Sequence, residues 1–312
     1  MIIVLGSVNL DLVARVPRLP SPGETLAGTS FAALPGGKGA NQALAARRAG
    51  ADVIMIGAVG RDAFAVPALA GLRVEGVDID NVATVAQPTG VALIHIDAAG
   101  ENAITIIAGA NGSASADNID AQRWSQASTL LMQLEIPITQ VTQAACEARR
   151  RGVRVILNAA PMQFLPAALL EAIDVLVVNE HEAAALAAQL HIDTDQCVLA
   201  DMLSQQLDAA VVLTLGAHGA MAAVDGIRLQ ARPPAISVVD TTGAGDAFTG
   251  ALASALQRNL SWPLALAAAV AAGSLACSSV GAQSALADAV TIAALAERVE
   301  LSQSPFSRVP RS

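Results

Sequence analysis

Aromatic residues are scarce in this chain of 312 residues: they make up 2% of it, and tyrosine is absent. A pocket that stacks a nucleoside base on aromatic rings is therefore disfavoured, although Phe31 and Trp124 leave that alternative open.

Basic side chains are outnumbered as well, because 18 Lys and Arg stand against 27 Asp and Glu and give a formal net charge of −9. That balance argues against a nucleic-acid surface or an anionic membrane as the partner. A phosphate-bearing ligand is still allowed, since helix N-termini bind phosphate without a net positive charge.

Cysteine occurs only three times, at Cys146, Cys197 and Cys277, and never in C-x-x-C spacing. An odd number of widely separated cysteines indicates a reducing compartment, with neither a disulfide framework nor a zinc site. The four histidines show no metal-ligand spacing either. The N-terminal "MIIVLG" lacks the basic region and the longer apolar run of a secretory signal, so we expect a cytoplasmic protein.

Charged residues are absent from 259–287, which superficially resembles a membrane span. The stretch consists mostly of Ala, Gly and Ser and is interrupted by Pro263 and Gly273, so its insertion energy would be weak. We therefore predict a tightly packed interior helix there.

Short apolar runs recur along the chain, bounded by Gly, Asn or Pro, and helical patterns lie between most of them. Continuous apolar strands that alternate with helices are typical of a parallel sheet covered on both faces. The fold class is therefore α/β, with a mostly parallel central sheet flanked by helices. The runs are Ile2–Leu5, Val53–Gly57, Thr129–Leu134, Val153–Leu157, Val175–Val178 and Ala210–Leu215.

Two segments break this alternation. Residues 12–34 have no helical period, and 90–109 alternate as two strands joined by a turn at 98–101. Together they predict a small sheet standing off the main domain, which needs a partner because an isolated two-stranded ribbon is only marginally stable. The tail after Leu301 is expected to be loosely ordered.

Polar residues follow several of the apolar runs, and in a parallel sheet ligands bind beyond the carboxyl ends of the strands. Any single one of these residues is more often a helix N-cap than a ligand. Gathered at one sheet edge, however, they suit a polyol bound through its hydroxyls beside a metal-bound phosphate. The residues are Asn9, Asp11, Glu135, Asn158, Asn179 and Glu182.

The stretch "PGGKGANQALAARRAG" (35–50) is a glycine loop that enters a helix. It is not the phosphate loop G-x-x-x-x-G-K-[ST], and no predicted strand precedes it as a dinucleotide fingerprint requires. One interpretation is a flexible hinge. The other is close backbone approach to a ligand, with Lys38 and Asn41 directed at it.

A second glycine loop, "DTTGAGDAFTG" (240–250), places Gly243, Ala244 and Gly245 directly before Asp246. Their backbone N–H groups would converge at a helix N-terminus and hold an anion. Asp246 beside them could take a proton from an alcohol while the loop holds the phosphoryl group that the alcohol attacks. The structural alternative is an aspartate in the first helical turn, favoured by the helix dipole by about 0.3–1 kcal/mol.

These two loops together resemble the two signatures of the ribokinase-like (PfkB) carbohydrate kinase family, and the similarity extends over nearly the whole chain. Further matching stretches are "GSVNLDLV" near the start, "PSPGET" (20–25), "GVALIHID" (90–97), "GENAITIIAGAN" (100–111), "LLMQLE" (130–135), "VNEHEA" (178–183), "TLGAHG" (214–219) and "GAQ" (281–283).

The resemblance implies an α/β kinase core (1–11, 35–89 and 110–312) with a β-sheet lid (12–34 and 90–109) that forms a homodimer contact. It implies transfer of phosphate from ATP to a sugar hydroxyl, with D-ribose to D-ribose 5-phosphate as the expected reaction, Mg²⁺ accompanying ATP and K⁺ or a similar monovalent cation as activator.

The resemblance also assigns residues by position. The implied sugar ligands are Asn9, Asp11, Gly37, Lys38, Asn41, Glu135 and Asp246. The implied base is Asp246, and the anion hole is Gly243, Ala244 and Gly245. The implied nucleotide contacts are Asn179, Thr214, Gly216, Gly219 and Gly245. Glu182 is implied to hold Mg²⁺ through water, and the implied monovalent cation ligands are Asp240, Thr242, Ala276, Ser279 and Gly281.

The chain departs from the family pattern at two places. Ala285 follows "GAQS" where Ser is usual, which puts a side-chain oxygen near the cation in doubt. Ala217 stands where a hydroxyl-bearing residue is often seen in the nucleotide loop. No adenine-contacting residue is implied, because the helix expected there offers mostly Ala.

Other functions remain open on the sequence alone. The acceptor could be another sugar, such as fructose, deoxyribose or 2-keto-3-deoxygluconate, or a nucleoside. A non-catalytic sugar-binding regulatory protein could share the fold, but it would be expected to lose the base or the anion loop, and both are present. A nicotinamide-dependent oxidoreductase lacks its G-x-G-x-x-G after the first strand.

Overall fold

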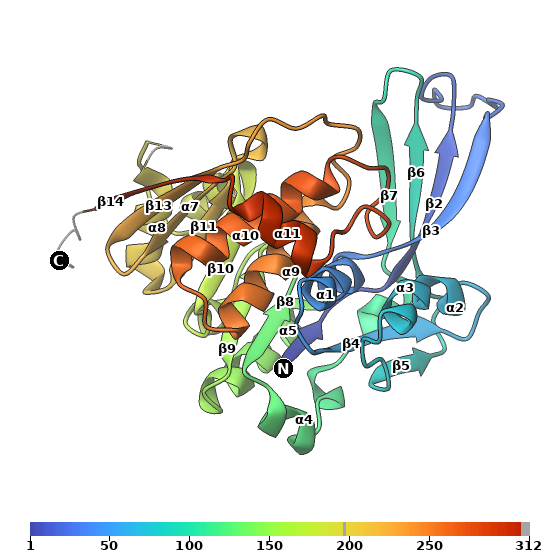
Figure 1. The fold of residues 1–312 in the computed structure, drawn as a ribbon. Helices are drawn as coiled ribbons and strands as arrows, with labels where there is room; N and C mark the ends of the chain where they lie inside the picture. The colour runs from blue at the N-terminus through green and yellow to red at the C-terminus, as the bar shows by residue number, and fades with distance from the viewer. Residues whose placement is uncertain (196–197, 307–312) are drawn as a thin grey trace.

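Two β-sheets of different size organise the chain (Figure 1). The computed structural model describes residues 1–195 and 198–306; Cys197 and the end of the tail lie outside the described residues. The larger sheet has ten strands and forms the body of the molecule, and the smaller has four strands and projects from one end of it.

The large sheet contains all six strands predicted from the apolar runs, which confirms the fold class. Seven neighbouring strands are parallel, and β12, β13 and β14 add to one edge in antiparallel fashion. In spatial order the strands are β14 (Glu300–Pro305), β13 (Ile227–Arg232), β12 (Ala220–Val224), β11 (Ala210–Thr214), β10 (Val175–Asn179), β9 (Arg154–Asn158), β8 (Thr129–Met132), β1 (Ile2–Leu5), β4 (Val53–Gly60) and β5 (Val82–Val85).

Helices cover both faces of this sheet, because alternate residues of each strand point to opposite sides. In β1, Ile2 and Val4 join one hydrophobic core and Ile3 and Leu5 join the other. The first core is covered by α1 (Lys38–Arg48), α2 (Ala65–Ala68), α3 (Ala70–Val74), α9 (Ala244–Gln257), α10 (Trp262–Ala276) and α11 (Ala289–Ala296). The second is covered by α4 (Ala121–Gln126), α5 (Ile138–Arg150), α6 (Ala167–Leu170), α7 (Glu180–Gln189) and α8 (Leu199–Leu207).

The uncharged stretch predicted to be an interior helix is α10, and that prediction is confirmed. It packs against α9 in the first core, where small side chains such as Ala269 and Ala271 are completely buried. No helix among the described residues is both long enough and apolar enough to cross a membrane.

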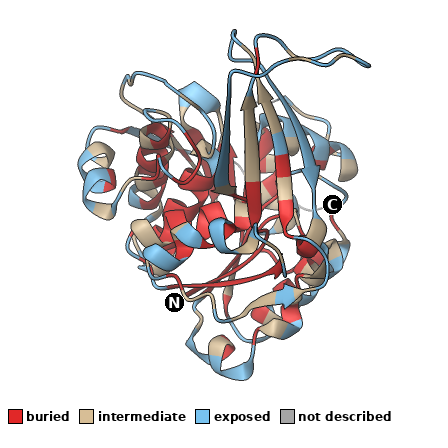
Figure 2. Ribbon diagram, turned by 90° about the vertical axis from the view of Figure 1, so that its right-hand side faces the viewer, coloured by how far each residue is buried: buried red, intermediate tan, exposed pale blue. Residues whose placement is uncertain are grey.

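The small sheet comprises β3 (Ser30–Gly36), β2 (Asn9–Arg15), β6 (Gly90–Ile96) and β7 (Asn102–Ile107), in that spatial order. The predicted hairpin at 90–109 is confirmed as β6 and β7, and the aperiodic segment contributes β2 and β3. The sheet is mixed, since β2 and β6 are parallel and both outer pairs are antiparallel. Figure 1 shows it projecting beside the body, and Figure 2 shows it face-on, with exposed residues along its outer strands.

The prediction of a loosely ordered tail was wrong for its first residues. Residues 302–305 of that tail belong to β14, which pairs with β13 from Ile227↔Pro305 to Arg232↔Glu300. All six residues of β14 are exposed, so this strand is held mainly by backbone hydrogen bonds at the sheet edge. A hydrophobic pattern cannot reveal a strand of that kind.

Candidate active site

The carboxyl ends of the central strands bring together the residues predicted to bind a sugar. Ser7, just after β1, donates from Oγ to Glu135 Oε2 at 2.6 Å, and Glu135 follows β8. The backbone N–H of Lys38, at the start of α1, donates to the same oxygen at 3.1 Å. The glycine loop before α1 thus lies directly against this sheet edge, as close backbone approach requires.

Asn9 begins β2 and is buried beside Asn111, which the sequence did not single out. The Asn111 side-chain amide donates to Asn9 Oδ1 at 2.6 Å, and its own Oδ1 accepts from the Val8 N–H at 2.8 Å. A Cβ at Gly90 would lie 2.3 Å from both side chains, so glycine is needed there. Asn111 ends the matching stretch "GENAITIIAGAN", which was the available signal.

Asp11, two residues along β2, reaches over Gly36, where a Cβ would approach its carboxylate to 2.2 Å. Burial raises the pKa of Asp11 to about 7, and repulsion from Glu135 and Asp246 adds to the effect. The nearby Lys38 has a pKa above its usual value, chiefly through attraction to Asp246 and further to Glu135 and Glu182, against the opposing effect of burial. The site therefore concentrates carboxylates around one ammonium group.

Asp246 lies in the first turn of α9 and is buried, with 6% of its surface exposed. Its two carboxylate oxygens accept separate hydrogen bonds from α1. Asn41 Nδ2 donates to Oδ2 at 3.0 Å, and Gln42 Nε2 donates to Oδ1 at 2.9 Å. The predicted pair Asn41 and Asp246 is thus in direct contact, whereas Gln42 was missed although it follows Asn41 in the signature.

The loop before α9 has the form that an anion site requires. Gly243 has a φ of 76°, and a Cβ on it would lie 2.8 Å from Ala282, so only glycine fits. Space around Gly245 is open, with nothing within 4 Å of a Cβ built there. The Ala244 N–H donates to the Thr241 carbonyl at 3.2 Å. The N–H groups that follow it in the first turn lack an intrahelical acceptor because they lie at the start of the helix.

A cavity of about 440 Å³ opens beside this loop. It is lined by the predicted nucleotide residues Thr214, Gly216, Gly219 and Gly245, and by residues not predicted from the sequence, among them Phe248 and Val270. The walls are mostly apolar, which suits the flat face of a base. One of these walls is formed by small residues of α10, the helix for which the sequence predicted no adenine-contacting residue.

Asn179 and Glu182 do not line that cavity; they form the N-terminal cap of α7. The Asn179 side chain accepts from the Glu182 N–H, and Glu182 Oε2 accepts from the Asn179 N–H at 2.8 Å. Burial raises the pKa of Glu182, although the Asn179 hydrogen bond and the charge of Lys38 oppose this. The cap occupies one carboxylate oxygen, Oε2, and the other accepts no side-chain hydrogen bond from the residues that the structure describes.

Asp240 connects the two segments predicted to hold a monovalent cation. Its carboxylate accepts from the Thr242 N–H and hydroxyl at 2.9 and 2.6 Å, and from the Gly281 N–H at 2.9 Å. Burial alone would raise the pKa of Asp240, but these bonds outweigh it and hold the pKa below its usual value. Ala276 and Ser279 lie on the segment that ends at Gly281, so the predicted set is adjacent in space.

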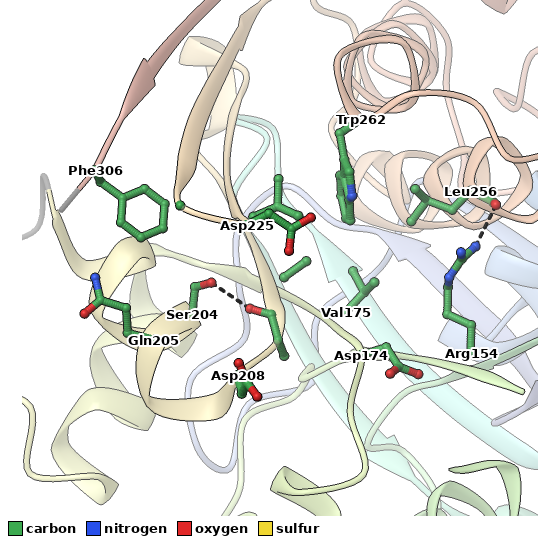
Figure 3. A pocket seen from close by; sticks show the side chains of 14 residues that line it. Arg154, Asp174, Val175, Ser204, Gln205, Asp208, Asp225, Leu256, Trp262 and Phe306 are labelled. Carbon is green, nitrogen blue, oxygen red and sulfur yellow. Dashed lines mark hydrogen bonds between the residues drawn. The ribbon is translucent and has the colours of Figure 1, made fainter. Parts of the chain in front are cut away.

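A larger cavity, of about 630 Å³, lies at the opposite edge of the sheet, where β9, β10 and β11 begin (Figure 3). Two of its polar side chains bond within the protein: Arg154 donates to the Leu256 carbonyl at 2.6 Å, and Ser204 to the Ala209 carbonyl at 2.7 Å. None of the predicted site residues lines it. Since ligands of parallel sheets bind at the carboxyl edge, the smaller cavity is the candidate for the nucleotide site.

Metal-binding groups are sparse in the described part of the chain. Within residues 1–195 and 198–306, no three His, Cys, Asp or Glu side chains are placed to hold a metal ion together. Any Mg²⁺ here would have to rely on substrate phosphates and water, which is its usual mode of binding.

Comparison with known families gives an independent assignment. The model of the pfkB family carbohydrate kinases matches residues 1–289. A ribokinase of Schizosaccharomyces pombe is 40% identical over 269 residues, covering 82% of this chain and 85% of that protein. A bifunctional ribokinase/ribose-5-phosphate isomerase A of Fructilactobacillus sanfranciscensis is 39% identical over 265 residues, which are 83% of this chain and 49% of that longer protein.

A solved structure has the same architecture. Arabidopsis thaliana ribokinase, determined in complex with ribose and ATP, superposes with a TM-score of 0.86 at 33% identity, covering 95% of this chain and 98% of the other.

Proposed function

This chain belongs to the pfkB family of carbohydrate kinases, and on that premise we propose that it transfers the γ-phosphoryl group of ATP to a hydroxyl of D-ribose. The observation that carries the proposal is the position of Asp246. It lies between the polar groups of the sheet edge and the apolar cavity, on the helix whose N-terminus faces both.

The sugar side of this arrangement suits a small polyol. Asn9, Asp11 and Glu135 offer amide and carboxylate groups that can pair with several hydroxyls, and the Lys38 ammonium lies among them. Gly37 has a φ of 89° and directs the loop backbone toward the same space. The names of the relatives, which are called ribokinase, support ribose rather than another acceptor as the proposed substrate of this chain.

In the reaction, Asp246 takes the proton of the attacking hydroxyl as the oxygen–phosphorus bond forms. The bond between the γ-phosphorus and the β,γ-bridging oxygen breaks, and ADP leaves. The N–H groups of Gly243 and Gly245 would bind the oxygens of the transferring group, and the dipole of α9 would stabilise their charge. Ala244, predicted as the third donor of the anion hole, donates its N–H to the Thr241 carbonyl at 3.2 Å instead. Asp246 thus acts as general base and the loop as anion hole.

The nucleotide occupies the cavity beside this loop in our proposal. Thr214, Gly216 and Gly219 contact it from β11 and the following turn, with Asn179 near the phosphates. Mg²⁺ would neutralise phosphate charge, held by those phosphates and reached through water by the Glu182 oxygen outside the helix cap. The donor set fits, because a single carboxylate with water is sufficient for Mg²⁺.

The monovalent cation site also belongs to this proposal. Asp240 joins the anion loop to the segment at Gly281, so a K⁺ ion held by the carbonyls of Thr242, Ala276, Ser279 and Gly281 would stiffen both. Those carbonyls survive the change to Ala285, because they are main-chain atoms.

The small sheet serves as a lid and as a dimer contact in the same proposal, with 12–34 and 90–109 as the lid and the rest of the chain as the kinase core. Asp11, Leu34 and Ile106 share one face by register, through the pairs Asp11↔Leu34, Asp11↔Ala92 and Ala92↔Ile106. Leu34, Ile104 and Ile106 expose 40–52% of their surfaces, an apolar face that a second copy of the chain would cover.

A cytoplasmic location accords with this activity and stays part of the proposal.

The proposal is tested by ATP turnover with a panel of pentoses, hexoses and nucleosides, coupled to ADP formation. Ribose should give the highest kcat/KM, and the product should carry phosphate on O5. If the protein turned over only another sugar or a nucleoside, that compound would replace ribose as the proposed substrate. No turnover with any acceptor, at sugar concentrations that bind, would leave the sugar-binding regulatory function in its place.

A further inference from the structure

Two chains of buried side-chain amides converge on Asp246, one on each carboxylate oxygen. The first runs from Gln133 Nε2 to Gln42 Oε1 at 2.7 Å, and from Gln42 Nε2 to Asp246 Oδ1. The second runs from Gln283 Nε2 to Asn41 Oδ1 at 3.1 Å, and from Asn41 Nδ2 to Asp246 Oδ2. All five residues expose 6% of their surface or less.

The direction of each chain follows from the carboxylate. An ionised carboxylate only accepts hydrogen bonds, so Gln42 must turn its nitrogen toward Asp246 and its oxygen away from it. That oxygen then needs a donor, which Gln133 supplies. Gln42 is constrained a second time by Asn158, whose Oδ1 accepts from Gln42 Nε2 at 2.9 Å while its own Nδ2 donates to the Val177 carbonyl.

Both chains end in the same unusual way. Among the described residues, three buried side-chain oxygens have no hydrogen-bond partner, and two of them are Gln133 Oε1 and Gln283 Oε1. Leaving such a group unpaired destabilises a fold, so each case calls for an explanation. The explanation here is the shared direction of the hydrogen bonds. Because every amide donates toward Asp246, the side-chain oxygen of the last amide in each chain has no donor.

Glycines hold the two terminal side chains in place. A Cβ at Gly6 would lie 2.0 Å from Gln133 Oε1, and a Cβ at Gly71 would lie 2.4 Å from Gln283 Oε1. The helices that carry the chains meet just as closely, since a Cβ at Gly250 of α9 would lie 2.5 Å from the Ala45 Cβ of α1. The separation between Asp246 and its donors is therefore fixed by backbone contact.

From this arrangement we infer that Gln133 and Gln283 are positioning residues for the phosphoryl transfer: through Gln42 and Asn41 they hold the Asp246 carboxylate in the orientation that accepts the proton of the sugar hydroxyl. The inference rests on the proposed function, in which Asp246 is the base. Gln133 acts only through the amide of Gln42. Without the Gln133 donor, the side-chain amide of Gln42 can rotate. Its oxygen would then face the Asp246 carboxylate, and the two oxygens would repel each other.

The two chains should differ in one respect. Gln42 is occupied on both hydrogens of Nε2, by Asp246 and Asn158, so the first chain has no donor left for the sugar. Asn41 uses one hydrogen of its nitrogen for Asp246 and is also a proposed sugar ligand. Loss of Gln133 should therefore affect kcat alone, whereas loss of Gln283 should affect both kcat and the KM for ribose.

The test replaces each glutamine by methionine, which keeps the length and removes the amide. Gln133→Met should lower kcat about tenfold with an unchanged KM for ribose, since the Gln42 amide that donates to the base loses the donor that orients it. Gln283→Met should lower kcat by a similar factor and raise the KM for ribose. The matched control is Gln189→Met, which breaks two hydrogen bonds of a glutamine to Leu165 in the other core and should leave kcat unchanged.

A double-mutant cycle separates positioning from general support of the fold. In the Asp246→Asn background, Gln133→Met should cause no further loss of kcat, because its effect passes through the missing carboxylate. A loss equal to that in the wild-type background would overturn the inference, as would an unchanged kcat in both glutamine variants. If Gln133→Met fails to fold, the same cycle with Gln283→Met decides.

The proposed function and this inference fail in different ways. Absence of ribose-dependent turnover in the unaltered protein would refute the proposed function. Ribose-dependent turnover that neither glutamine influences would refute only the positioning role.

Discussion

The position and the neighbours of Asp246 suit it to the proposed role of general base. It is buried in the first turn of a helix, where the dipole favours a negative charge, and it lies close to Asp11 and to Lys38. The two hydrogen bonds to its carboxylate oxygens come from the side-chain amides of Asn41 and Gln42, which orient the carboxylate.

The change Asp246→Asn removes the proton acceptor and keeps the shape of the side chain. General base catalysis contributes about 10²–10⁴ in rate, so kcat should fall by at least the lower factor while the dissociation constant for ribose changes little. Initial rates and calorimetric titration of ribose measure the two quantities. A variant that keeps more than about a tenth of the original kcat would contradict the assignment of the base.

Asp11 makes the stability of the sugar-free protein depend on pH. Its pKa is raised from 3.8 to about 7 in the folded state, so the folded chain binds a proton that the unfolded chain releases between these values. The contribution of this group to stability is therefore present at acid pH and is lost as the pH rises from about 4 to 7.

Asp11→Asn should consequently stabilise the protein at pH 8, on the order of 1–3 kcal/mol, and hardly at all at pH 4. Thermal unfolding of both proteins across this range measures the difference. A difference in melting temperature that stays constant from pH 4 to pH 8 would show that Asp11 is not the titrating group.

At the scale of the elements, the glycine loops connect the chemistry to the fold. The loop at 240–246 is shaped by Gly243, which packs on Ala282, and by Asp240, which binds Gly281. The conformation of the anion site thus depends on a segment about 40 residues later in the chain. A monovalent cation at that junction would act on the loop without touching the sugar.

Replacing K⁺ by Na⁺ or by a bulky organic cation at constant ionic strength should therefore lower kcat and leave the KM for ribose nearly unchanged. Preorganised donors act mainly on the transition state, so several-fold differences in kcat among the three cations are expected. Coupled ATP turnover with each cation as the sole monovalent ion gives the comparison. Equal rates in all three would remove the cation from the proposal.

The elements also show how far the sequence could lead. Six central strands and the hairpin at 90–109 were predictable, because apolar runs and alternation survive in buried or half-buried strands. β14 was not, and β3 was covered only by the prediction that 12–34 joins a small sheet, since the side chains of both strands are largely exposed and leave no periodic pattern. Of the site, the signature residues were predictable through the family resemblance. Gln42, Gln133 and Asn111 were not, because their roles depend on partners about 90–120 residues away.

At the scale of the whole molecule, the small sheet is the least self-sufficient part. Within the described part of the chain, the face of its four strands that bears Leu34, Ile104 and Ile106 is left exposed, and exposed apolar faces of this kind mark association surfaces. That face is continuous with Asp11, so whatever covers it also closes the sugar side of the site.

The double change Ile104→Lys and Ile106→Lys should therefore convert a dimer into a monomer and raise the KM for ribose, by roughly tenfold, because burying a lysine in the interface is unfavourable. Light scattering coupled to gel filtration reports the mass. Phe164→Lys, at an exposed Phe on the body of the molecule, is the control. A monomeric unaltered protein would contradict the dimer, and a dimer that persists in the double variant would place the contact on another surface.

The pairing of Asn41 with Asp246 also bears on biosynthesis, because 205 positions separate the two residues. A growing chain contains all residues proposed to contact the sugar except Asp246 once Glu135 is added. The nucleotide cavity draws on residues from Thr214 to Cys277, and the second amide chain requires Gln283. An incomplete polypeptide released from the ribosome before that point could gather sugar ligands but would have no oriented proton acceptor. Premature termination should therefore yield fragments that do not consume ATP, which makes the order of the chain itself a safeguard against wasteful hydrolysis.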